Sequence, residues 1–244
     1  AAQIGWRHRL GDAWQARGRV ARAFRVPQAG ELYRLQRGQD VADLRPEVLD
    51  GVELGLSGAG HNWALGLDAY VYDKRNVIIR DAEGFNLSDG RTRHRGVEIE
   101  GNAHLAAGWW LSGNAAYSVQ RYAFDRAIAG GETIVRGNEV DTAPRRLGSL
   151  RLNRLDPRLG RFELEWVYQG GHYLDAANTR RHGGHDLWHL RWQRDLRAGL
   201  GLSARLTNLA DRRYAERADF AFGQFRYFPG AGRQIFVALH YRSP

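Results

Sequence analysis

Two histidines three residues apart are the residues in this sequence most able to do chemistry. His182 and His185 lie within the run from Arg180 to Asp186, and Asp175 or Asp186 would supply a carboxylate. Imidazole and carboxylate groups together bind transition metals or contact a metal chelate. Because no third ligand at a defined spacing accompanies the two imidazoles, we expect exposed loop histidines here and no metal site.

Hydrolytic chemistry has little support in the sequence. Neither Ser57 nor Ser112 lies in a Gly-x-Ser-x-Gly pattern, which would hold a nucleophile on a strained turn. The glycine pair Gly130-Gly131 has no lysine after it, so it indicates a turn rather than a phosphate-binding loop. We predict no catalytic residue, no cofactor and no enzymatic activity. A serine–histidine pair at hydrogen-bond distance would support the alternative interpretation of the chain as a hydrolase.

Carboxylates recur in pairs on predicted strand faces. Glu98 and Glu100 share one face of a strand, and Glu163 and Glu165 share a face of another. Two neighbouring carboxylates could do acid–base work. Inside a barrel they would instead face the lumen and pair with arginines, and we favour this second interpretation. The expected partners are Arg151, Arg161 and Arg191.

The elements that carry these residues alternate with a period of two. Val97, Ile99 and Leu105 lie on one face of their run, and Glu98 and Glu100 lie on the other. This pattern predicts strands with one apolar and one polar face, and no long helix. We place strands near residues 4–9, 14–24, 51–57, 63–79, 94–105, 109–121, 145–155, 161–170, 185–195, 199–207 and 233–241.

Short and long connections alternate along the chain, as they do in outer-membrane barrels with short periplasmic turns and long extracellular loops. About eleven strands, an odd number, would leave the edge of the first strand unpaired in lipid. We therefore predict an all-β fold, namely an antiparallel transmembrane β-barrel segment with about 11 strands of a roughly 22-stranded barrel. The long connections are expected at 25–50, 80–93, 122–144, 171–184 and 208–232.

Composition narrows the possible partners. The 244 residues include no Cys, which removes disulfides and thiolate sites. Mean hydropathy is −0.54, too polar for a helical membrane protein. Net charge is +9, and Lys74 is the only lysine. The arginines are scattered rather than gathered in a basic block. We therefore expect no nucleic-acid binding. Arginines that face a lumen or the lipopolysaccharide layer account for the excess of positive charge.

Aromatic residues gather near predicted strand ends. In a bilayer they would form interfacial girdles, because a ring with a polar edge prefers the headgroup level. Packing in the core of a soluble β-sandwich is the alternative, and the alternating connection lengths favour girdles. The residues are Trp109, Trp110, Tyr117, Tyr122, Trp166, Tyr168, Trp188, Trp192, Tyr227, Phe228 and Tyr241.

A series of short motifs runs through nearly the whole chain in a fixed order: Ala23-Phe24-Arg25-Val26-Pro27 with Glu31-Leu32-Tyr33, Leu44-Arg45-Pro46-Glu47, the run from Tyr70 to Ile78, Arg95-Gly96-Val97-Glu98-Ile99-Glu100-Gly101, Thr142-Ala143-Pro144-Arg145, Asn208-Leu209-Ala210-Asp211-Arg212-Arg213-Tyr214 and Phe228-Pro229-Gly230. Together they resemble the barrel of TonB-dependent outer-membrane receptors. Each motif also has a structural role: we expect the prolines to end ladder pairing, and Asn208 and Asp211 to bond nearby backbone.

The resemblance implies that residues 1–244 form the C-terminal half of such a barrel in the outer membrane of a Gram-negative bacterium. It implies uptake of a scarce metal complex, most often a ferric siderophore, energised through TonB. The plug domain and the box that binds TonB, which precede the barrel in this family, are expected outside these residues. Family members usually end in an aromatic residue, whereas Ser243 stands near this terminus, which bears on barrel assembly.

The long loops are where ligand contacts are expected. Aromatic and arginine side chains suit an anionic, aryl-bearing chelate. Outer-membrane lipid and lipopolysaccharide are the other expected partners. Three alternatives stay open: a complete smaller barrel such as a porin or adhesin, an outer-membrane hydrolase, and a soluble basic β-protein. The candidate ligand-binding residues are Tyr33, Arg37, Arg91, Arg93, Tyr173, Asn178, His182, Phe220, Phe222 and Arg226.

Overall fold

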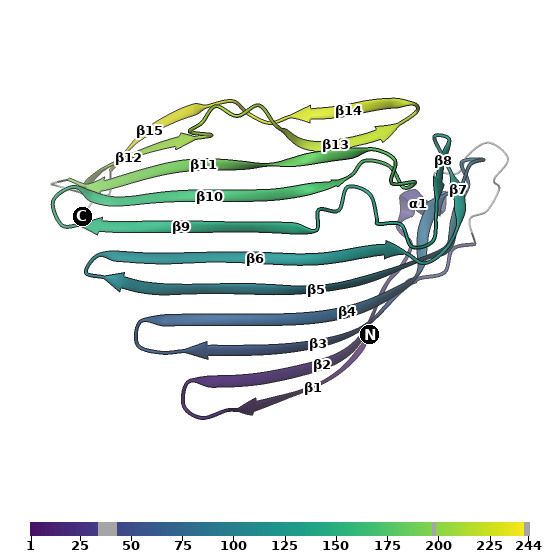
Figure 1. Cartoon of the computed structure of the whole chain (residues 1–244), viewed down its shortest axis with the longest axis horizontal. Helices are drawn as coiled ribbons and strands as arrows, with labels where there is room; N and C mark the ends of the chain where they lie inside the picture. The colour runs from purple at the N-terminus through teal and green to yellow at the C-terminus, as the bar shows by residue number, and fades with distance from the viewer. Residues whose placement is uncertain (34–42, 197–198, 242–244) are drawn as a thin grey trace.

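The computed structural model describes residues 1–33, 43–196 and 199–241. One antiparallel sheet of eleven strands dominates it, and neighbours in the sheet follow one another along the chain (Figure 1). Its strands are β1 (Ala2–Arg9), β2 (Trp14–Arg25), β3 (Glu47–Ala59), β4 (Trp63–Arg80), β5 (Asn86–Ala106), β6 (Trp109–Tyr122), β9 (Arg146–Asp156), β10 (Gly160–Tyr173), β11 (Arg181–Asp195), β12 (Leu200–Thr207) and β15 (Gln234–Tyr241).

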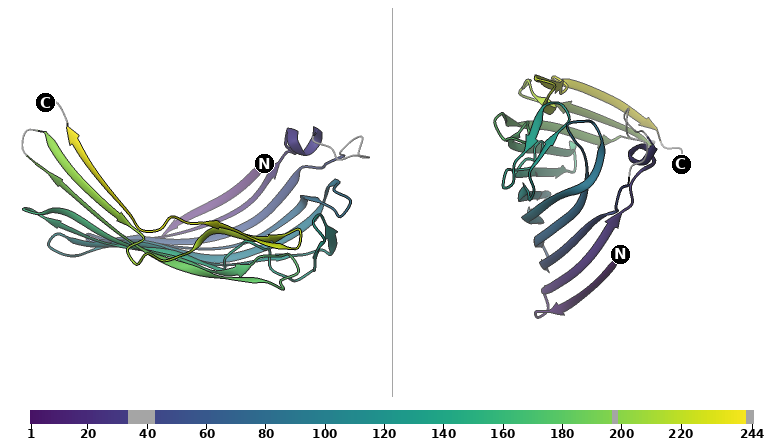
Figure 2. Two further views of the ribbon diagram at one scale, coloured as in Figure 1. Left: turned by 90° about the horizontal axis from the view of Figure 1, so that it is seen from above. Right: turned by 90° about the vertical axis from the view of Figure 1, so that its right-hand side faces the viewer.

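Smaller elements gather at one end of this sheet, which we call the long-loop end. They are the helix α1 (Ala29–Tyr33), the hairpin of β7 (Arg126–Ile128) and β8 (Glu132–Ile134), and the hairpin of β13 (Ala215–Ala221) and β14 (Gln224–Pro229). The opposite end carries only short turns (Figure 1). Figure 2 shows that the sheet bends across its width like part of a cylinder. Within the described residues, β1 and β15 each pair on one side only.

The predicted strands correspond one to one with the eleven strands of the sheet, and the all-β prediction is confirmed. The main error is at the long-loop end, where strands extend further than the sequence suggested. β5 begins at Asn86 rather than near residue 94, and β11 begins at Arg181 rather than near 185. In these extensions both faces are polar, so no alternation marks them. The two hairpins and α1 were missed, because segments of three to seven residues carry too little pattern.

One face of the sheet, which we call the apolar face, exposes large aliphatic side chains throughout. Cross-strand neighbours on it are Leu67 with Ile99, and Ala204 with Val237. Val237 is 68% exposed and Ile99 is 44% exposed, which water would penalise over so wide a surface. The face also includes Ile4, Val20, Val52, Leu54, Val71, Val97, Leu150, Leu190, Ile235 and Leu239.

The height of this face matches a bilayer. On β4, Trp63 and Asp73 are ten residues apart in sequence. That distance is about 33 Å along a strand, and about 25 Å across a membrane at a tilt of about 40°. Within the described residues, no helix is long and apolar enough to cross a membrane.

The opposite face, which we call the polar face, is held by ion pairs between strands. Arg17 on β2 contacts Asp68 on β4 at 2.5 Å, and Arg151 on β9 contacts Glu165 on β10 at 2.7 Å. Arg191 contacts both Glu163 and Glu165. The predicted pairing with arginine is therefore confirmed for Glu163 and Glu165. Among the described residues Glu98 and Glu100 form no ion pair, and Arg161 donates to the Asn153 amide oxygen instead.

The expected aromatic girdle is confirmed only in part. Trp109, Tyr117 and Trp188 lie on the apolar face, 37–42% exposed. Trp110 and Tyr122 lie on the polar face instead, because each is an odd number of residues away from Tyr117 on the same strand. Tyr227 and Phe228 belong to β14 at the long-loop end rather than to the girdle.

Candidate functional site

A continuous run of aromatic and imidazole rings lies at the long-loop end, where the β13–β14 hairpin packs beside β10 and β11. His172 lies 5.2 Å from His182, which lies 6.5 Å from Tyr227, measured between ring centroids. The run continues from Tyr227 to Phe225 at 6.2 Å and from Phe225 to Phe220 at 5.2 Å. We call these five residues the ring cluster.

A tight loop after β10 supports the ring cluster. Asp175 is 1% exposed, and its carboxylate accepts hydrogen bonds from the Thr179 and Arg180 amides at 3.0 and 2.9 Å. Short acidic side chains favour such turns because they bond the backbone a few residues on. The loop thereby holds Arg180 over the Phe220 ring, 3.6 Å from its centroid.

A small apolar core anchors the hairpin to that loop. Leu174, Ala215 and Ala218 are buried together, and Phe220 packs against them. The Phe220 amide donates to the Leu174 carbonyl at 2.9 Å, which ties β13 to the end of β10. The ring cluster is therefore built on an ordered support, unlike a free loop.

The corner between β12 and β13 sets the direction of the hairpin. Asn208 adopts a φ of 50°, and its side-chain amide donates to the Arg212 and Ala231 carbonyls at 2.8 and 3.1 Å. The Asp211 carboxylate accepts from the Arg233 amide at 2.9 Å. The predicted bonding of these two side chains to nearby backbone is confirmed, and it joins both ends of the hairpin segment.

Burial favours the neutral form of two imidazoles in this region, those of His172 and His185. His172 and His185 are 6% and 8% exposed, and the Nδ1 atom of each has no hydrogen-bond partner among the described residues. Burial and the neighbouring His182 lower the pKa of both rings. A neutral ring can stack on a ligand or accept a hydrogen bond from it, without repelling a cation.

The expectation of two exposed loop histidines is wrong, because both residues lie on β11 and His185 is buried. The His182 ring contacts that of His172 at an angle of 35°, whereas the His185 ring lies 4.7 Å from that of Tyr214. The Asp175 carboxylate accepts hydrogen bonds from its own loop, and the Asp186 carboxylate pairs with Arg212. The described part of the chain contains no group of three His, Asp or Glu placed to hold a metal ion.

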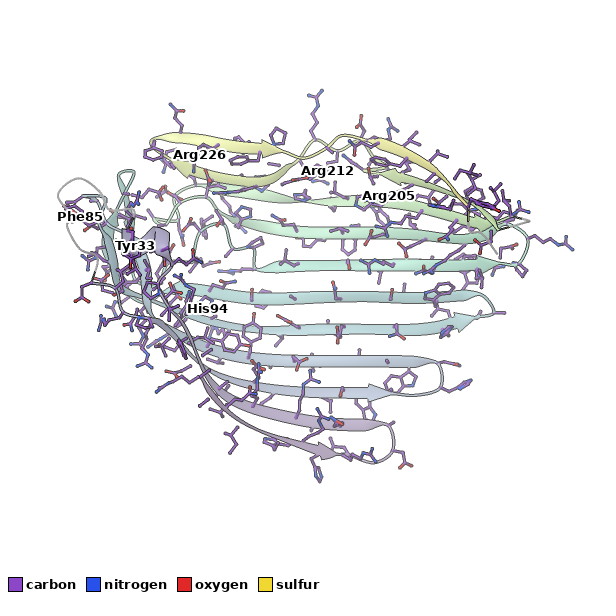
Figure 3. All side chains as sticks on the ribbon, turned by 180° about the vertical axis from the view of Figure 1, so that it is seen from behind. Tyr33, Phe85, His94, Arg205, Arg212 and Arg226 are labelled. Atoms are coloured by element: carbon purple, nitrogen blue, oxygen red, sulfur yellow. The ribbon has the colours of Figure 1, made fainter. Side chains whose placement is uncertain are left out.

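The structure brings half of the sequence-predicted ligand residues to this region. Tyr173, Asn178, His182, Phe220 and Arg226 all lie on β10, β11, their loop or the hairpin, and Figure 3 shows Arg226 on the hairpin. Asn178 is a support, because its side chain bonds the Glu139 amide and carbonyl at 2.7 and 2.9 Å. Arg226 binds Asp219 at 2.6 Å.

The other predicted ligand residues lie outside the ring cluster and its supports. Phe222, 75% exposed, is on the hairpin but at its tip, close to Gly130. Tyr33 ends α1, away from the ring cluster (Figure 3). Arg91 and Arg93 hold Asp73 at 2.6 and 3.4 Å. Arg37 lies outside the described residues.

Sequence reasoning missed four residues of the site: His172, Arg181, Phe225 and Tyr227. A usable signal was the alternation of aromatic residues in Phe225-Arg226-Tyr227, which marks one face of a strand. Arg181 lies over the Tyr173 ring at 5.8 Å and is exposed, with no carboxylate partner among the described residues. Flat rings beside an unpaired guanidinium suit an anionic ligand with aryl or other planar groups.

A serine–histidine contact does exist on the polar face. Ser203 Oγ on β12 lies 2.9 Å from His240 Nε2 on β15. The other ring nitrogen of His240 has no hydrogen-bond partner in the described residues, so nothing orients the imidazole as a triad acid would. β12 pairs here with β11 on one side and β15 on the other, so its amides beside Ser203 are not free to form an oxyanion hole.

The family model and the similar proteins all describe outer-membrane receptors. The family model described as "TonB dependent receptor-like, beta-barrel" matches residues 2–209. The chain is 28% identical over 219 residues to the ferrichrome outer membrane transporter/phage receptor of Escherichia coli K12, and 27% identical over 194 residues to the ferric-pyoverdine BN7/BN8 receptor of Pseudomonas putida. These alignments cover 85% and 78% of the chain.

A solved structure supports the same fold. The ferric yersiniabactin uptake receptor from Yersinia pestis superposes with a TM-score of 0.81 at 22% identity, over 97% of this chain and 36% of that one. The matches to the two relatives span only 28% and 22% of their lengths.

Proposed function

The chain belongs to the TonB-dependent receptor-like β-barrel family, and from that premise we propose that it serves in the uptake of a metal chelate, most often a ferric siderophore. The family consists of transport receptors of the Gram-negative outer membrane. The proposal rests chiefly on one observation: an ordered cluster of rings and a free arginine stands at the long-loop end of a wall whose apolar face is as tall as a bilayer.

We propose that residues 1–244 form the C-terminal half of the barrel wall. Two features support this division. The chain spans roughly a quarter of the length of its curated relatives, and β1 and β15 each have an unpaired edge among the described residues. In lipid such edges need partner strands. The plug and the TonB-binding box belong, on this proposal, to a part of the receptor outside these residues.

The open edges also weigh against a complete smaller barrel. In a porin or adhesin of this strand number, the first and last strands would pair, and β1 and β15 do not. The apolar face weighs against a soluble basic β-protein, because such exposure would promote aggregation in water.

The proposed ligand contacts are the ring cluster and Arg181. Relatives are named for ferrichrome and for ferric pyoverdine, and these two compounds are the natural first probes. The imidazole and aromatic rings would stack on planar groups of the chelate, while Arg181 would meet its negative charge. The other sequence-predicted residues would act as supports of this surface or lie beyond it.

Uptake in cells tests the proposal. The gene would be deleted in its Gram-negative host, and uptake of radioactive iron supplied as ferrichrome or ferric pyoverdine would be measured during iron starvation. We expect uptake of at least one ferric chelate to fall on deletion, to return with the gene, and to disappear when TonB is removed. Unchanged uptake over a panel of chelates, including citrate and catecholate complexes, would refute the proposal.

A further inference from the structure

The open edge of β1 presents an arginine without a partner. All eight residues of β1 are exposed, and within the described residues this strand pairs only with β2. On the polar face, Arg7 stands directly opposite Arg17 of β2. Arg7 forms no hydrogen bond and no ion pair with any described residue. A carboxylate on the open side of the strand would offset the repulsion between these two cations.

Four other arginines on the polar face show how this sheet places such carboxylates. Arg19 stands directly opposite Glu53 on the next strand, and the two side chains are 2.5 Å apart. Arg151 stands directly opposite Glu165 at 2.7 Å. The other two directly opposite pairs are Arg25 with Glu47 and Arg191 with Glu163. Opposite charges in this arrangement stabilise a sheet, because the two Cβ atoms are only about 5 Å apart.

The described side of β1 does not supply a carboxylate to Arg7. Directly opposite Arg17 on β3 is Gly55, and Arg17 reaches past it to Asp68 on β4 at 2.5 Å. Gly55 leaves room for this contact because it lacks a side chain, and a Cβ there would lie 2.5 Å from the Arg17 guanidinium. Asp68 is thereby committed to Arg17, and it lies three strands away from β1. Arg7 is left facing a like charge.

Neither open edge of the chain offers the missing carboxylate. β1 and β15 contain no Asp and no Glu. Closure of β15 onto β1 would therefore leave Arg7 without an acidic neighbour on its open side. Pairing of β1 with either edge strand of a second copy would do the same. Only a strand outside these residues could supply the carboxylate.

We propose that the strand paired with β1 in the complete barrel carries an Asp or Glu directly opposite Arg7, on the polar face. In lipid this edge has to be paired, because hydrocarbon offers no hydrogen-bond partner to its backbone. The carboxylate gives Arg7 the same pairing that the four other arginines have. The proposal rests on the division of the receptor into two halves given above, but not on the identity of the chelate.

The edge at β15 presents no charged partner of this kind. The side chains of β15 on the polar face are Gln234, Phe236, Ala238 and His240, and none is an arginine, a lysine or a carboxylate. The two open edges therefore differ in charge. An ion pair at Arg7 helps each edge select its own partner strand, because the wrong strand would leave the guanidinium unpaired.

Disulfide mapping in the complete receptor identifies the residue opposite Arg7. This chain contains no Cys, so Arg7→Cys introduces its only thiol. Single cysteines would be placed at successive positions of the strand beside β1, with any other cysteine of the receptor replaced by Ser, and oxidised in outer membranes. Directly opposite Cβ atoms lie about 4.5–5.5 Å apart, so the fastest disulfide marks the opposite residue. We expect this position to be Asp or Glu in the wild type.

A double-mutant cycle then measures whether the two side chains interact. We expect a coupling of about threefold in the folding equilibrium constant, in lipid vesicles, between Arg7→Gln and replacement of the partner acid by its amide. Arg205→Gln is the matched control, because Arg205 also faces a like charge, Arg191, but lies between two described strands. Its effect should add to that of the partner replacement without coupling.

A fastest disulfide to a position that is neutral or basic in the wild type would overturn the proposal. So would additive effects of Arg7→Gln and the partner replacement, or a disulfide that joins two copies of the receptor through β1. Uptake of ferrichrome and ferric pyoverdine by the same cells separates this inference from the proposed function. If either chelate is taken up and the residue opposite Arg7 is not acidic, only the inference fails. If neither chelate nor any other ferric chelate is taken up but Arg7 is coupled to a carboxylate, the transport proposal fails and the inference stands.

Discussion

The strand wall and the long-loop end of the molecule are held by different kinds of interaction. In the wall, β3 pairs with β4 over an unbroken register from Val48 opposite Arg75 to Ala59 opposite Ala64. A repeated pattern fixes this register, with aliphatic residues on one face of the sheet and ion pairs on the other. At the long-loop end the chain is held by single side chains bonded to backbone, such as Asp175 and Asn208.

Backbone conformation shows the same division. Among the described residues, the six non-glycine residues with positive φ lie in connections, at the bulge of β4 or, for Asn208 and Asp211, in the corner between β12 and β13. Five of them are Asn, Asp or Thr, whose side chains can bond local backbone and offset the strain. The sixth is Phe222 at the hairpin tip, at a φ of 54°. Within the described residues, these conformations therefore occur at bulges and connections rather than in the regularly paired parts of the strands.

The largest effect is expected for a charge placed on the apolar face. Ala115 and Ala116 are adjacent on β6 and point to opposite faces, opposite Ile99 and Glu98 respectively. We expect Ala115→Arg to destabilise the barrel by about 2–4 kcal/mol, because the cation faces lipid near mid-membrane. Ala116→Arg should cost less than about 1 kcal/mol, since Glu98 stands opposite it. Urea titration of the receptor in lipid vesicles measures both, and equal costs would abolish the distinction between the faces.

Removal of the Asp175 carboxylate should be the largest disruption at the loop end. Asp175→Ala leaves the amides of Thr179 and Arg180 unpaired, so local stability should fall by about 1–3 kcal/mol. Hydrogen exchange of residues 174–180 would measure the loss. Asp125→Ala is the control, because that carboxylate also accepts a backbone amide hydrogen bond, from Arg136 at 2.8 Å, but is 63% exposed, so water can replace it. If both variants exchange alike, the loop is not held by Asp175.

A smaller effect is expected when one ring of the cluster is truncated. Tyr227→Ala should weaken ferric chelate binding about tenfold, the loss of roughly one stacking contact, while leaving the fold intact. Tyr33→Ala serves as the control, since Tyr33 is 81% exposed on α1 and outside the cluster. Fluorescence quenching by the chelate gives both dissociation constants. The reverse result, with Tyr33 dominant, would move the site to the other side of the long-loop end.

Acid should loosen the hairpin without affecting the wall. Burial and His182 lower the pKa of His172 below its ordinary value of 6.5, an effect that backbone hydrogen bonds with Gly170 and Ala218 and the charge of Asp141 only partly oppose. The undocked state then takes up protons more readily than the docked state, so docking is strongest above pH 6.5 and weakens as the pH falls below it. Exchange of the Phe220 amide, which bonds the Leu174 carbonyl, reports docking. His172→Gln should remove the His172 part of this dependence, and an unchanged profile would assign it to another group.

The smallest effect concerns the serine–histidine contact in the wall. Ser203→Ala removes the hydrogen bond to His240, and we expect chelate uptake to stay within about twofold of the wild type, since a part-exposed neutral hydrogen bond contributes only about 1 kcal/mol. A hydrolysis assay on a fluorogenic ester, with wild type and variant side by side, provides the second readout. Ester cleavage that depends on Ser203 would show a catalytic role that the geometry does not support.

The difference between the regions also explains what could be predicted from the sequence. The eleven wall strands follow from alternation, because lipid imposes an apolar residue at every second position, as in Val97 and Ile99. The corner bonds of Asn208 and Asp211 could be predicted because their side chains act on residues close in sequence. The pairing of His172 with His182 could not, since it depends on the register of β10 with β11 above the membrane, where no alternation fixes that register.

The central claim is that the ring cluster at the long-loop end receives the chelate. A structure of the complete receptor with whichever ferric chelate it imports, located by the anomalous scattering of iron, tests this most directly. We predict the iron peak beside His182 and Tyr227, with a planar group of the chelate stacked on one of these rings. An iron peak whose chelate contacts only the α1 side of the long-loop end, or only the polar face of the wall, would contradict the account.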